Sequence, residues 1–223
     1  MPKLKDVIND LIACYGLREN ISQKEYLKIL DFYNQGEHGK CVAMVRKHFK
    51  LSMVKFHVFY VDKNDATFKR ARELNGKKRQ TSNSHLTSFA EPVMWVNASD
   101  NIPLYGTKDF SQLTLILKIR KDMFSFPFDF FLLSLGHEMA HVVLYSTRNP
   151  RRYSEKATDI LTLTQGFLDV QERVSNMGLV SYLSPTEVTG IISFIHKKRQ
   201  EKNSPIKERK TWKNPWKLLK LFS

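Results

Sequence analysis

Apolar residues recur at helical spacing through the first fifty residues of the chain. One run begins at Leu4 and ends at Gly16. A second helix is expected after Ser22, because Ser22 and Glu25 have the spacing of a capping box, in which each side chain satisfies a free backbone N–H of the other residue. A weaker pattern over residues 41–49 indicates a third helix. The N-terminal part is therefore predicted to be helical.

The period changes after this region, and residues 56–61, 92–97 and 113–119 are predicted to be strands. The last of them, Leu-Thr-Leu-Ile-Leu-Lys-Ile, is apolar enough to be at least half buried. Between the first two, residues 63–88 form a basic stretch with Gly and Ser, which favours a helix fragment and a loop. The middle of the chain should thus form a small sheet.

Helical spacing returns in the second half of the chain. Pro127 lies where an N1 proline favours helix initiation, and an apolar helix should run from it to about Thr147. The next helix begins near Ser154 and carries apolar residues at spacings of three and four as far as Val174. Ser184 opens the last helix with a capping box and an N1 proline. The predicted fold is α+β, a small sheet followed by a helical half.

Composition fits a globular protein with a sizeable core, since 42% of the 223 residues are hydrophobic and 26% are charged. Cys14 and Cys41 are too few for a disulfide framework, and no signal segment is recognisable, so we expect a cytoplasmic protein with reduced thiols. The longest apolar stretch, residues 124–135, contains Asp129 and is shorter than the roughly 18 residues of a membrane-spanning helix. A transmembrane class is therefore excluded.

The net charge of +14 is concentrated in two segments. Residues 196–223 carry ten Lys or Arg against two Glu, and residues 63–80 carry seven Lys or Arg against one Asp and one Glu. Such segments favour an anionic partner, which could be nucleic acid, acidic protein or lipid. We divide the chain into an N-terminal helical region (1–55), a core (56–196) and a basic, Trp-containing tail (197–223).

The sequence Gly-His-Glu-Met-Ala-His, with His137, Glu138 and His141, lies inside the predicted apolar helix. Histidines four residues apart share a helix face, so both can bind one Zn²⁺ ion per chain. Glu138 can then take a proton from a metal-activated water and pass it to the leaving amine. The alternative is a pair of core histidines satisfied by hydrogen bonds. A metal is favoured because unpaired His and Glu side chains are costly to bury.

A catalytic zinc ion needs a third protein ligand and an open fourth position. Glu155 and Asp159 are the candidates, because they follow His141 closely and lie four residues apart on one face of the next helix. The longer Glu155 reaches the metal more naturally, and Asp159 then accepts the N–H of a ligating histidine, most naturally His137. The alternative is that Glu155 only favours a helix N-terminus and Asp159 is a solvated surface residue.

These residues together resemble the gluzincin group of zinc metallopeptidases. The histidine motif, the Glu-Lys-Ala-Thr-Asp of residues 155–159, the later Gly-Phe pair at 166–167 and the stretch 182–187 are similar to compact bacterial and mobile-element zincin domains, a group that includes peptidases cleaving phage-type repressors. The resemblance covers roughly residues 90–196 and implies a zincin-like fold with an active-site helix. It assigns His137, His141 and Glu155 as ligands, Glu138 as general base and Asp159 as the partner of a ligand.

The resemblance also implies an edge strand that binds an extended substrate by strand addition, which we assign to residues 113–119. An ordinary core strand is the alternative. A hydrogen-bond donor to the developing oxyanion is expected as well. Tyr145 lies two turns beyond His137 and Tyr153 lies in the connecting loop, so both are candidates, with simple packing as the alternative.

Two further features carry hypotheses of their own. Cys14 or Cys41 could supply a thiolate that masks the zinc ion, although lone cysteines are usually small core residues. The tail combines basic residues with tryptophan, as single-stranded nucleic-acid sites do. An amphipathic docking segment and a solvated tail are its alternatives. The candidate nucleic-acid contacts are Lys197, Lys198, Arg199, Arg209, Lys210, Trp212 and Trp216.

The sequence thus predicts a zinc endopeptidase that acts on a protein or peptide target. Regulation of this activity by nucleic acid through the basic segments is a further hypothesis that is left open. The alternative is a nucleic-acid-binding regulatory protein in which the zinc site is structural or vestigial.

Overall fold

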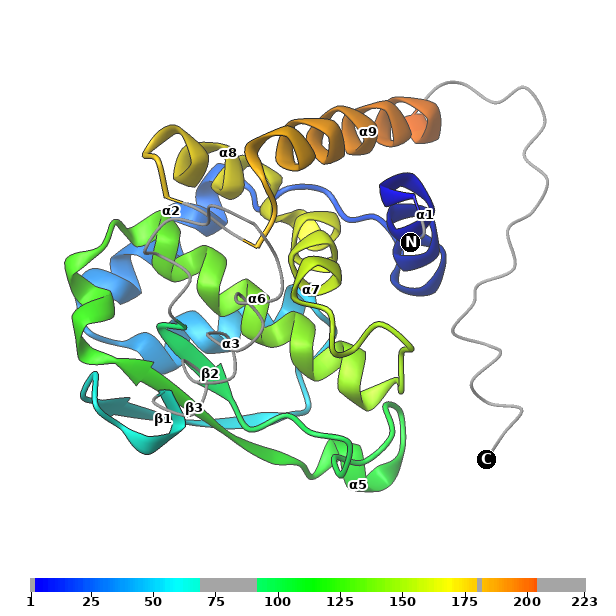
Figure 1. Cartoon of the computed structure of the whole chain (residues 1–223). Helices are drawn as coiled ribbons and strands as arrows, with labels where there is room; N and C mark the ends of the chain where they lie inside the picture. Colours follow the sequence, from blue (N-terminus) through cyan, green and yellow to red (C-terminus); the bar gives the residue numbers. More distant parts are fainter. Residues whose placement is uncertain (1–2, 69–91, 180–181, 204–223) are drawn as a thin grey trace, which may run out of the picture.

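The computed structural model describes residues 3–68, 92–179 and 182–203, and its elements form the expected α+β fold (Figure 1). Three helices come first: α1 (Leu4–Tyr15), α2 (Gln23–Asn34) and α3 (His38–His48). The sheet region contains β1 (Lys55–Val61), β2 (Met94–Val96), the short helix α5 (Lys108–Ser111), β3 (Thr114–Arg120) and the 3-10 helix η1 (Lys121–Ser125). The helical half contains α6 (Phe128–Ser146), α7 (Glu155–Thr162), the π-helical segment η2 (Leu163–Phe167), α8 (Leu168–Asn176) and α9 (Pro185–Asn203). Most of the basic stretch 63–88 and the tail beyond 203 lie outside the described residues.

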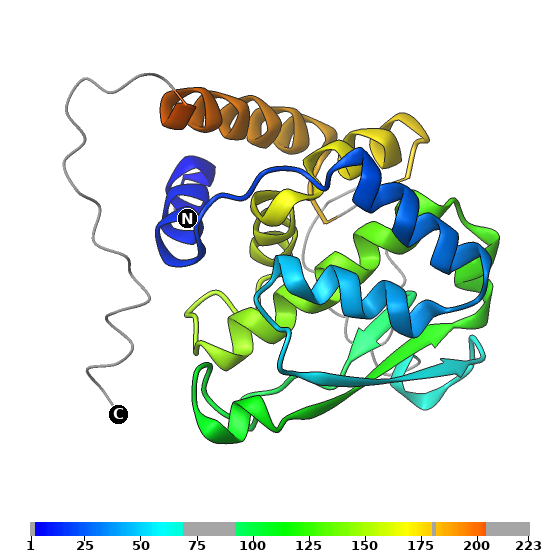
Figure 2. The ribbon, with the colours of Figure 1, turned by 180° about the vertical axis from the view of Figure 1, so that it is seen from behind.

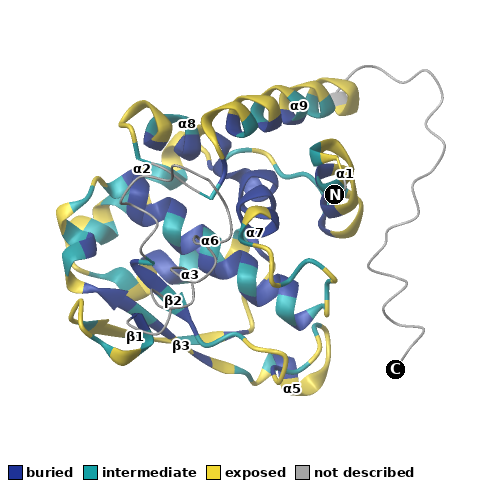
Figure 3. Cartoon of the chain, viewed as in Figure 1, coloured by how far each residue is buried: buried dark blue, intermediate teal, exposed yellow. Residues whose placement is uncertain are grey.

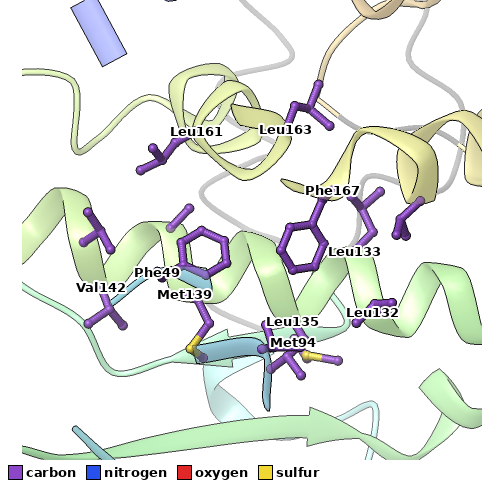
Figure 4. Packing of buried hydrophobic residues seen from close by; sticks show 14 of the residues in the cluster. Phe49, Met94, Leu132, Leu133, Leu135, Met139, Val142, Leu161, Leu163 and Phe167 are labelled. Carbon is purple, nitrogen blue, oxygen red and sulfur yellow. The ribbon is translucent and has the colours of Figure 1, made fainter. Parts of the chain in front are cut away.

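Helix α6 is the centre of the molecule. On one side it packs with α3 against the sheet, and on the other side it contacts α7 and α8 (Figures 1 and 2). Helices α1 and α9 lie farther out, where α1 contacts both α7 and α9. Because α6 is covered on both sides, it is apolar almost all round and largely buried (Figure 3). Figure 4 shows Phe167 and Leu163 on one side of α6 and Met94 of β2 on the other.

The sheet is mixed, with the strand order β1-β3-β2. Strand β3 runs parallel to β1 and antiparallel to β2, and its residues Leu115, Leu117 and Ile119 are at most 1% exposed. The assignment of residues 113–119 as the substrate-binding edge is therefore wrong, because β3 is the central strand, paired with β1 along its length and with β2 over residues 117–119. Among the described residues, the edge strand on that side is β2, whose three residues give too short a pattern to reveal its position in the sheet.

The helix starts follow the capping signals with small differences. Ser184 and Glu187 exchange both bonds of their capping box, at 2.8 and 3.3 Å. Ser22 accepts the N–H of Glu25 at 3.3 Å, while the Glu25 carboxylate contacts His48. Pro127 lies at the N-cap of α6 and not at N1, since its ψ of 147° is extended.

The predicted helix from Ser154 to Val174 is interrupted at Gly166, whose φ of 106° is outside the helical range. The loop between α1 and α2 lies against this break. Its backbone N–H groups at Arg18 and Ile21 donate to the carbonyls of Thr164 and Gly166, each at 3.0 Å. A Cβ at Gly166 would lie 2.5 Å from the carbonyl oxygen of Glu19, so the close approach requires glycine.

Apart from Phe68, the buried apolar residues of the described ranges form one cluster that runs from Ile8 to Ile195. The cluster crosses residue 55, so the N-terminal helices share their core with the sheet and the helical half. The division of the chain at this point stays a prediction. Among the described helices, none combines the length and the apolar character needed to span a bilayer.

Candidate metal centre

Helix α6 directs both histidines of its motif toward α7. The rings of His137 and His141 are 4.7 Å apart between centroids, and their side chains are 13% and 16% exposed. Their Nε2 atoms approach the same atom, Oε2 of Glu155, at 3.1 and 3.2 Å. One ligand atom from each of the three residues lies within 4.8 Å of the others, which makes this a candidate metal site. The three predicted ligands are thus brought together.

Asp159 lies one turn after Glu155 on α7 and is 7% exposed, so it is not a solvated surface residue. Its Oδ1 accepts a hydrogen bond from Nδ1 of His137 at 2.7 Å, and its Oδ2 accepts the backbone N–H of Tyr182 at 2.9 Å. The hydrogen bond from His137 to Asp159 keeps a proton on Nδ1 of His137, so that Nε2 can bind a metal. The predicted pairing of Asp159 with His137 is present in the structure.

Local sequence explains why α7 lies close enough to α6. Ser154 caps α7 by accepting the N–H of Ala157 at 3.3 Å, which places Glu155 in the first turn. Gly136 precedes the first histidine, and a Cβ at that position would lie 2.9 Å from the Phe167 ring and 3.0 Å from Thr162. The absence of a side chain at Gly136 therefore allows α6 and α7 to approach closely.

Glu138 points toward the sheet. The residue is 8% exposed, and its Oε2 accepts the backbone N–H of Val96 at 2.8 Å. Asn97 donates its N–H to Ile116 of β3, so the Val96 N–H belongs to the outer edge of β2. Burial raises the pKa of Glu138 above its ordinary value. Nothing in the sequence indicated the contact with Val96, because it depends on how the sheet packs.

Without a metal, His137 and Glu155 form a coupled acid–base pair. Burial alone would lower the pKa of His137, but hydrogen bonds to Asp159 and Glu155 raise it well above the ordinary value. Burial alone would raise the pKa of Glu155, but hydrogen bonds from His137 and His141 lower it. A proton on Nε2 of His137 therefore occupies the position that a metal ion would take.

The tyrosines near the site have different environments. The Tyr145 ring lies 6.3 Å from that of His141 between centroids and 5.7 Å from that of Tyr153. Tyr153 is 56% exposed, and its hydroxyl donates to the Asp100 carboxylate. Tyr182 was not among the predicted site residues, yet its ring stacks on His137 at 5.6 Å. Its signal in the sequence was its place at the start of the stretch 182–187, which contributes to the family resemblance but assigns Tyr182 no role.

Neither cysteine belongs to the metal cluster of the described residues. Cys41 is fully buried in α3, where its thiol donates to the carbonyl of Ile29 at 3.5 Å. Burial raises the pKa of Cys41 to about 12, so its thiol stays protonated. Cys14 is exposed on α1. Cys41 is therefore a core residue, and the arrangement gives no support to a cysteine that masks the metal.

The structure places the predicted nucleic-acid contacts in different environments. Arg199 donates to the carbonyl of Arg18 at 2.7 Å and to Oδ1 of Asn20 at 2.8 Å, so its guanidinium group holds α9 against the loop after α1. Lys197 and Lys198 lie on the same helix and line a groove. The remaining four candidates, from Arg209 to Trp216, lie outside the described residues.

Comparison with protein-family models, with curated proteins and with solved structures gives no significant match to this chain. The site therefore has to be interpreted from its own geometry.

Proposed function

We propose that the protein is a zinc-dependent endopeptidase of the gluzincin type with a zincin-like fold. One observation carries the proposal: three ligand atoms converge within 4.8 Å, and the buried carboxylate of Glu138 belongs to the same helix turn as the two histidines. A purely structural metal site requires converging ligands but does not require a buried carboxylate, such as that of Glu138, which is not one of the ligands.

The donor set fits zinc. Two imidazole nitrogens and one carboxylate oxygen, from His137, His141 and Glu155, form the three-ligand set of a catalytic zinc ion with one position left open. Magnesium and calcium prefer an all-oxygen set, which these residues do not provide. Asp159 supports the proposal further, since hydrogen-bonded carboxylates commonly orient the histidines of such sites.

A zinc ion held by these residues supplies a Lewis acid that activates water and polarises the substrate carbonyl. Glu138 takes the proton of the attacking water and later delivers it to the leaving amine. Its raised pKa suits this exchange, because a base that titrates nearer to neutrality both accepts and returns a proton readily. The Val96 N–H orients the carboxylate during both steps.

The outer edge of β2 is suited to hold the substrate. The Val96 N–H on this edge is taken by Glu138, so a substrate would pair with the backbone groups of Met94, which face the same edge because residues two apart on a strand point the same way. An extended peptide added to this edge would pass Glu138. The role assigned from the sequence to residues 113–119 is therefore proposed for β2, with selectivity for an unfolded or locally extended protein segment.

The test uses the zinc-loaded protein and a mixture of unstructured peptides, with products read by mass spectrometry. We expect cleavage by the native protein, and a loss of about 10² to 10⁴-fold in Glu138→Gln, which keeps the shape of the side chain but cannot act as a base. Both proteins should retain equal zinc. Glu172→Gln, a change at a partly exposed glutamate on α8, is the matched control and should cleave normally.

Peptide cleavage that is equal in the native protein and Glu138→Gln would refute the proposed mechanism. Zinc bound with full occupancy but without any cleavage would favour a structural metal site.

A further inference from the structure

Helices α1 and α9 contact each other on the side of the molecule away from the sheet (Figures 1 and 2). Buried Ile8 and Leu11 anchor α1, while Ile191 and Ile195 anchor α9. Between the two helices lies a groove of about 260 Å³ that is separate from the metal centre. The groove is lined by Lys5 of α1 and by Gly190, Ser193, Phe194, Lys197, Lys198 and Glu201 of α9.

The lining of α9 follows one face of the helix. Its positions are spaced by three and four residues from 190 to 201, so they form a continuous stripe. Gly190 and Ser193 are small and exposed, and a Cβ at Gly190 would meet no atom within 4 Å. The stripe therefore leaves room for a ligand to lie close to the helix backbone.

The charges of the groove are mostly positive. Lys198 forms an ion pair with Glu201 at 3.3 Å and also lies 5.6 Å from the centre of the Phe194 ring. Within the described part of the chain, Lys5 and Lys197 have no acidic partner within ion-pair distance. Three lysines against one glutamate surround a concave surface, where the field of like charges adds up.

We propose that this groove binds the backbone of a single-stranded nucleic acid. Lys5, Lys197 and Lys198 neutralise phosphate groups, and the Phe194 ring supplies an apolar face on which a base or sugar packs. Gly190 allows the strand to approach the helix. The site goes beyond the proposed peptidase activity and does not depend on it.

The shape and the ring favour nucleic acid over other polyanions. A bilayer surface is flat and would meet the rim of a groove between two helices without reaching its floor. An acidic peptide would use the lysines but not the partly buried Phe194 ring beside Lys198. A stacking surface next to cationic side chains is the combination that single strands use.

The test measures binding of the full chain to a labelled single-stranded DNA of about 20 nucleotides by fluorescence anisotropy over a series of salt concentrations. One variant combines Lys5→Gln, Lys197→Gln and Lys198→Gln. Each lost phosphate contact should reduce the slope of log affinity against log salt by about 0.7, so the three together should reduce it by about 2 and weaken binding about 100-fold at 0.1 M salt.

The control combines Lys28→Gln, Lys55→Gln and Lys108→Gln, which removes the same charge from exposed residues outside the groove. It should keep the native slope, and both variants should keep the native melting temperature. Phe194→Leu should weaken binding several-fold without changing the slope, as expected for lost stacking.

Equal slopes in the two triple variants would overturn the proposal, because binding would then follow net charge alone. Undetectable binding at low salt would overturn it too. Displacement of the DNA by poly-glutamate or by anionic vesicles at equal charge concentration would reassign the groove to an acidic polypeptide or a lipid surface.

Discussion

At the scale of single residues, the two nitrogens of His137 have different tasks. Nδ1 is held by Asp159, while Nε2 faces Glu155 and His141. The carboxylates on α7 therefore differ in role although both are acidic and one turn apart. In the proposed site, Glu155 completes the ligand set, and Asp159 orients the ligand His137.

This difference predicts unequal effects on metal affinity. Asp159→Ala should weaken zinc binding by about 10 to 100-fold, as is usual for the loss of a group that orients a ligand. Glu155→Ala should weaken it far more, because one of three protein ligands disappears. Competition with a fluorescent chelator gives both values, and Glu172→Ala is the control. A larger effect at Asp159 than at Glu155 would reverse the two assignments.

The roles of the neighbouring Tyr145 and Tyr153 can also be distinguished by substitution. If Tyr145 stabilises the oxyanion, Tyr145→Phe should lower kcat by about 10² to 10³-fold with zinc content unchanged. Tyr153→Phe should have a much smaller effect, because the Tyr153 hydroxyl already donates to Asp100. Steady-state kinetics on a cleaved peptide would distinguish them. Equal kcat values in Tyr145→Phe and the native protein would leave Tyr145 as a packing residue.

At the scale of secondary-structure elements, the metal site depends on the distance between α6 and α7. Glu155 and Asp159 both lie on α7, and Gly136 of α6 determines how closely α7 approaches α6. Gly136→Ala should destabilise the protein by about 1 to 3 kcal/mol, as overpacking of a core contact does. It should also weaken zinc binding, because α7 must shift outward and carry Glu155 with it.

Gly39→Ala is the matched control for this prediction. Gly39 lies in α3, and a Cβ there would meet no atom within 4 Å. This substitution should leave stability unchanged or raise it by up to about 1 kcal/mol through helix propensity. Chemical denaturation and zinc titration of the two variants provide the measurement. A stable Gly136→Ala protein with native zinc affinity would show that α7 is free to adjust.

Sequence reasoning worked where the determinants are local and failed where they are not. The capping box at Ser184 and the helical spacing of His137 and His141 depend on a few neighbouring residues, so they could be predicted. The edge position of β2 and the break at Gly166 depend on contacts with distant parts of the chain. The contact of Glu138 with the sheet could not be predicted for the same reason.

At the scale of the whole molecule, metal binding should be coupled to stability. A ligand that binds only the folded state at 100 times its Kd adds about 2.7 kcal/mol to the free energy of unfolding. The site joins α6 to α7, so zinc should raise Tm, and removal by a chelator should lower it. His137→Ala should show no zinc-dependent change in Tm.

The stability of the metal-free protein, and with it the size of the zinc-dependent rise in Tm, should depend on pH. In the metal-free protein, the raised pKa of His137 contributes stability below its ordinary value of 6.5, and this contribution is lost as pH rises through the raised pKa. The lowered pKa of Glu155 contributes stability above its ordinary value of 4.5, which is lost as pH falls. The paired state is therefore favoured between about 4.5 and 6.5.

Zinc must displace the proton of His137, so its affinity should increase as pH rises. The difference in Tm between zinc-loaded and metal-free protein should accordingly be larger at about pH 8 than at about pH 6. Differential scanning fluorimetry across this range measures it. An equal difference at both pH values would contradict the coupling of proton and metal at His137.

The loop after α1 has a consequence for the order in which parts of the protein fold during synthesis. Arg18 and Ile21 leave the ribosome early, but the carbonyls that they bind, at Thr164 and Gly166, are synthesised much later. Until then the apolar face of α1, with Ile8 and Leu11, has no surface to cover it. Contacts between such distant parts of a chain form slowly, and exposed apolar segments recruit chaperones. Helix α1 is translated before the elements that cover it, so it should be among the last elements to fold.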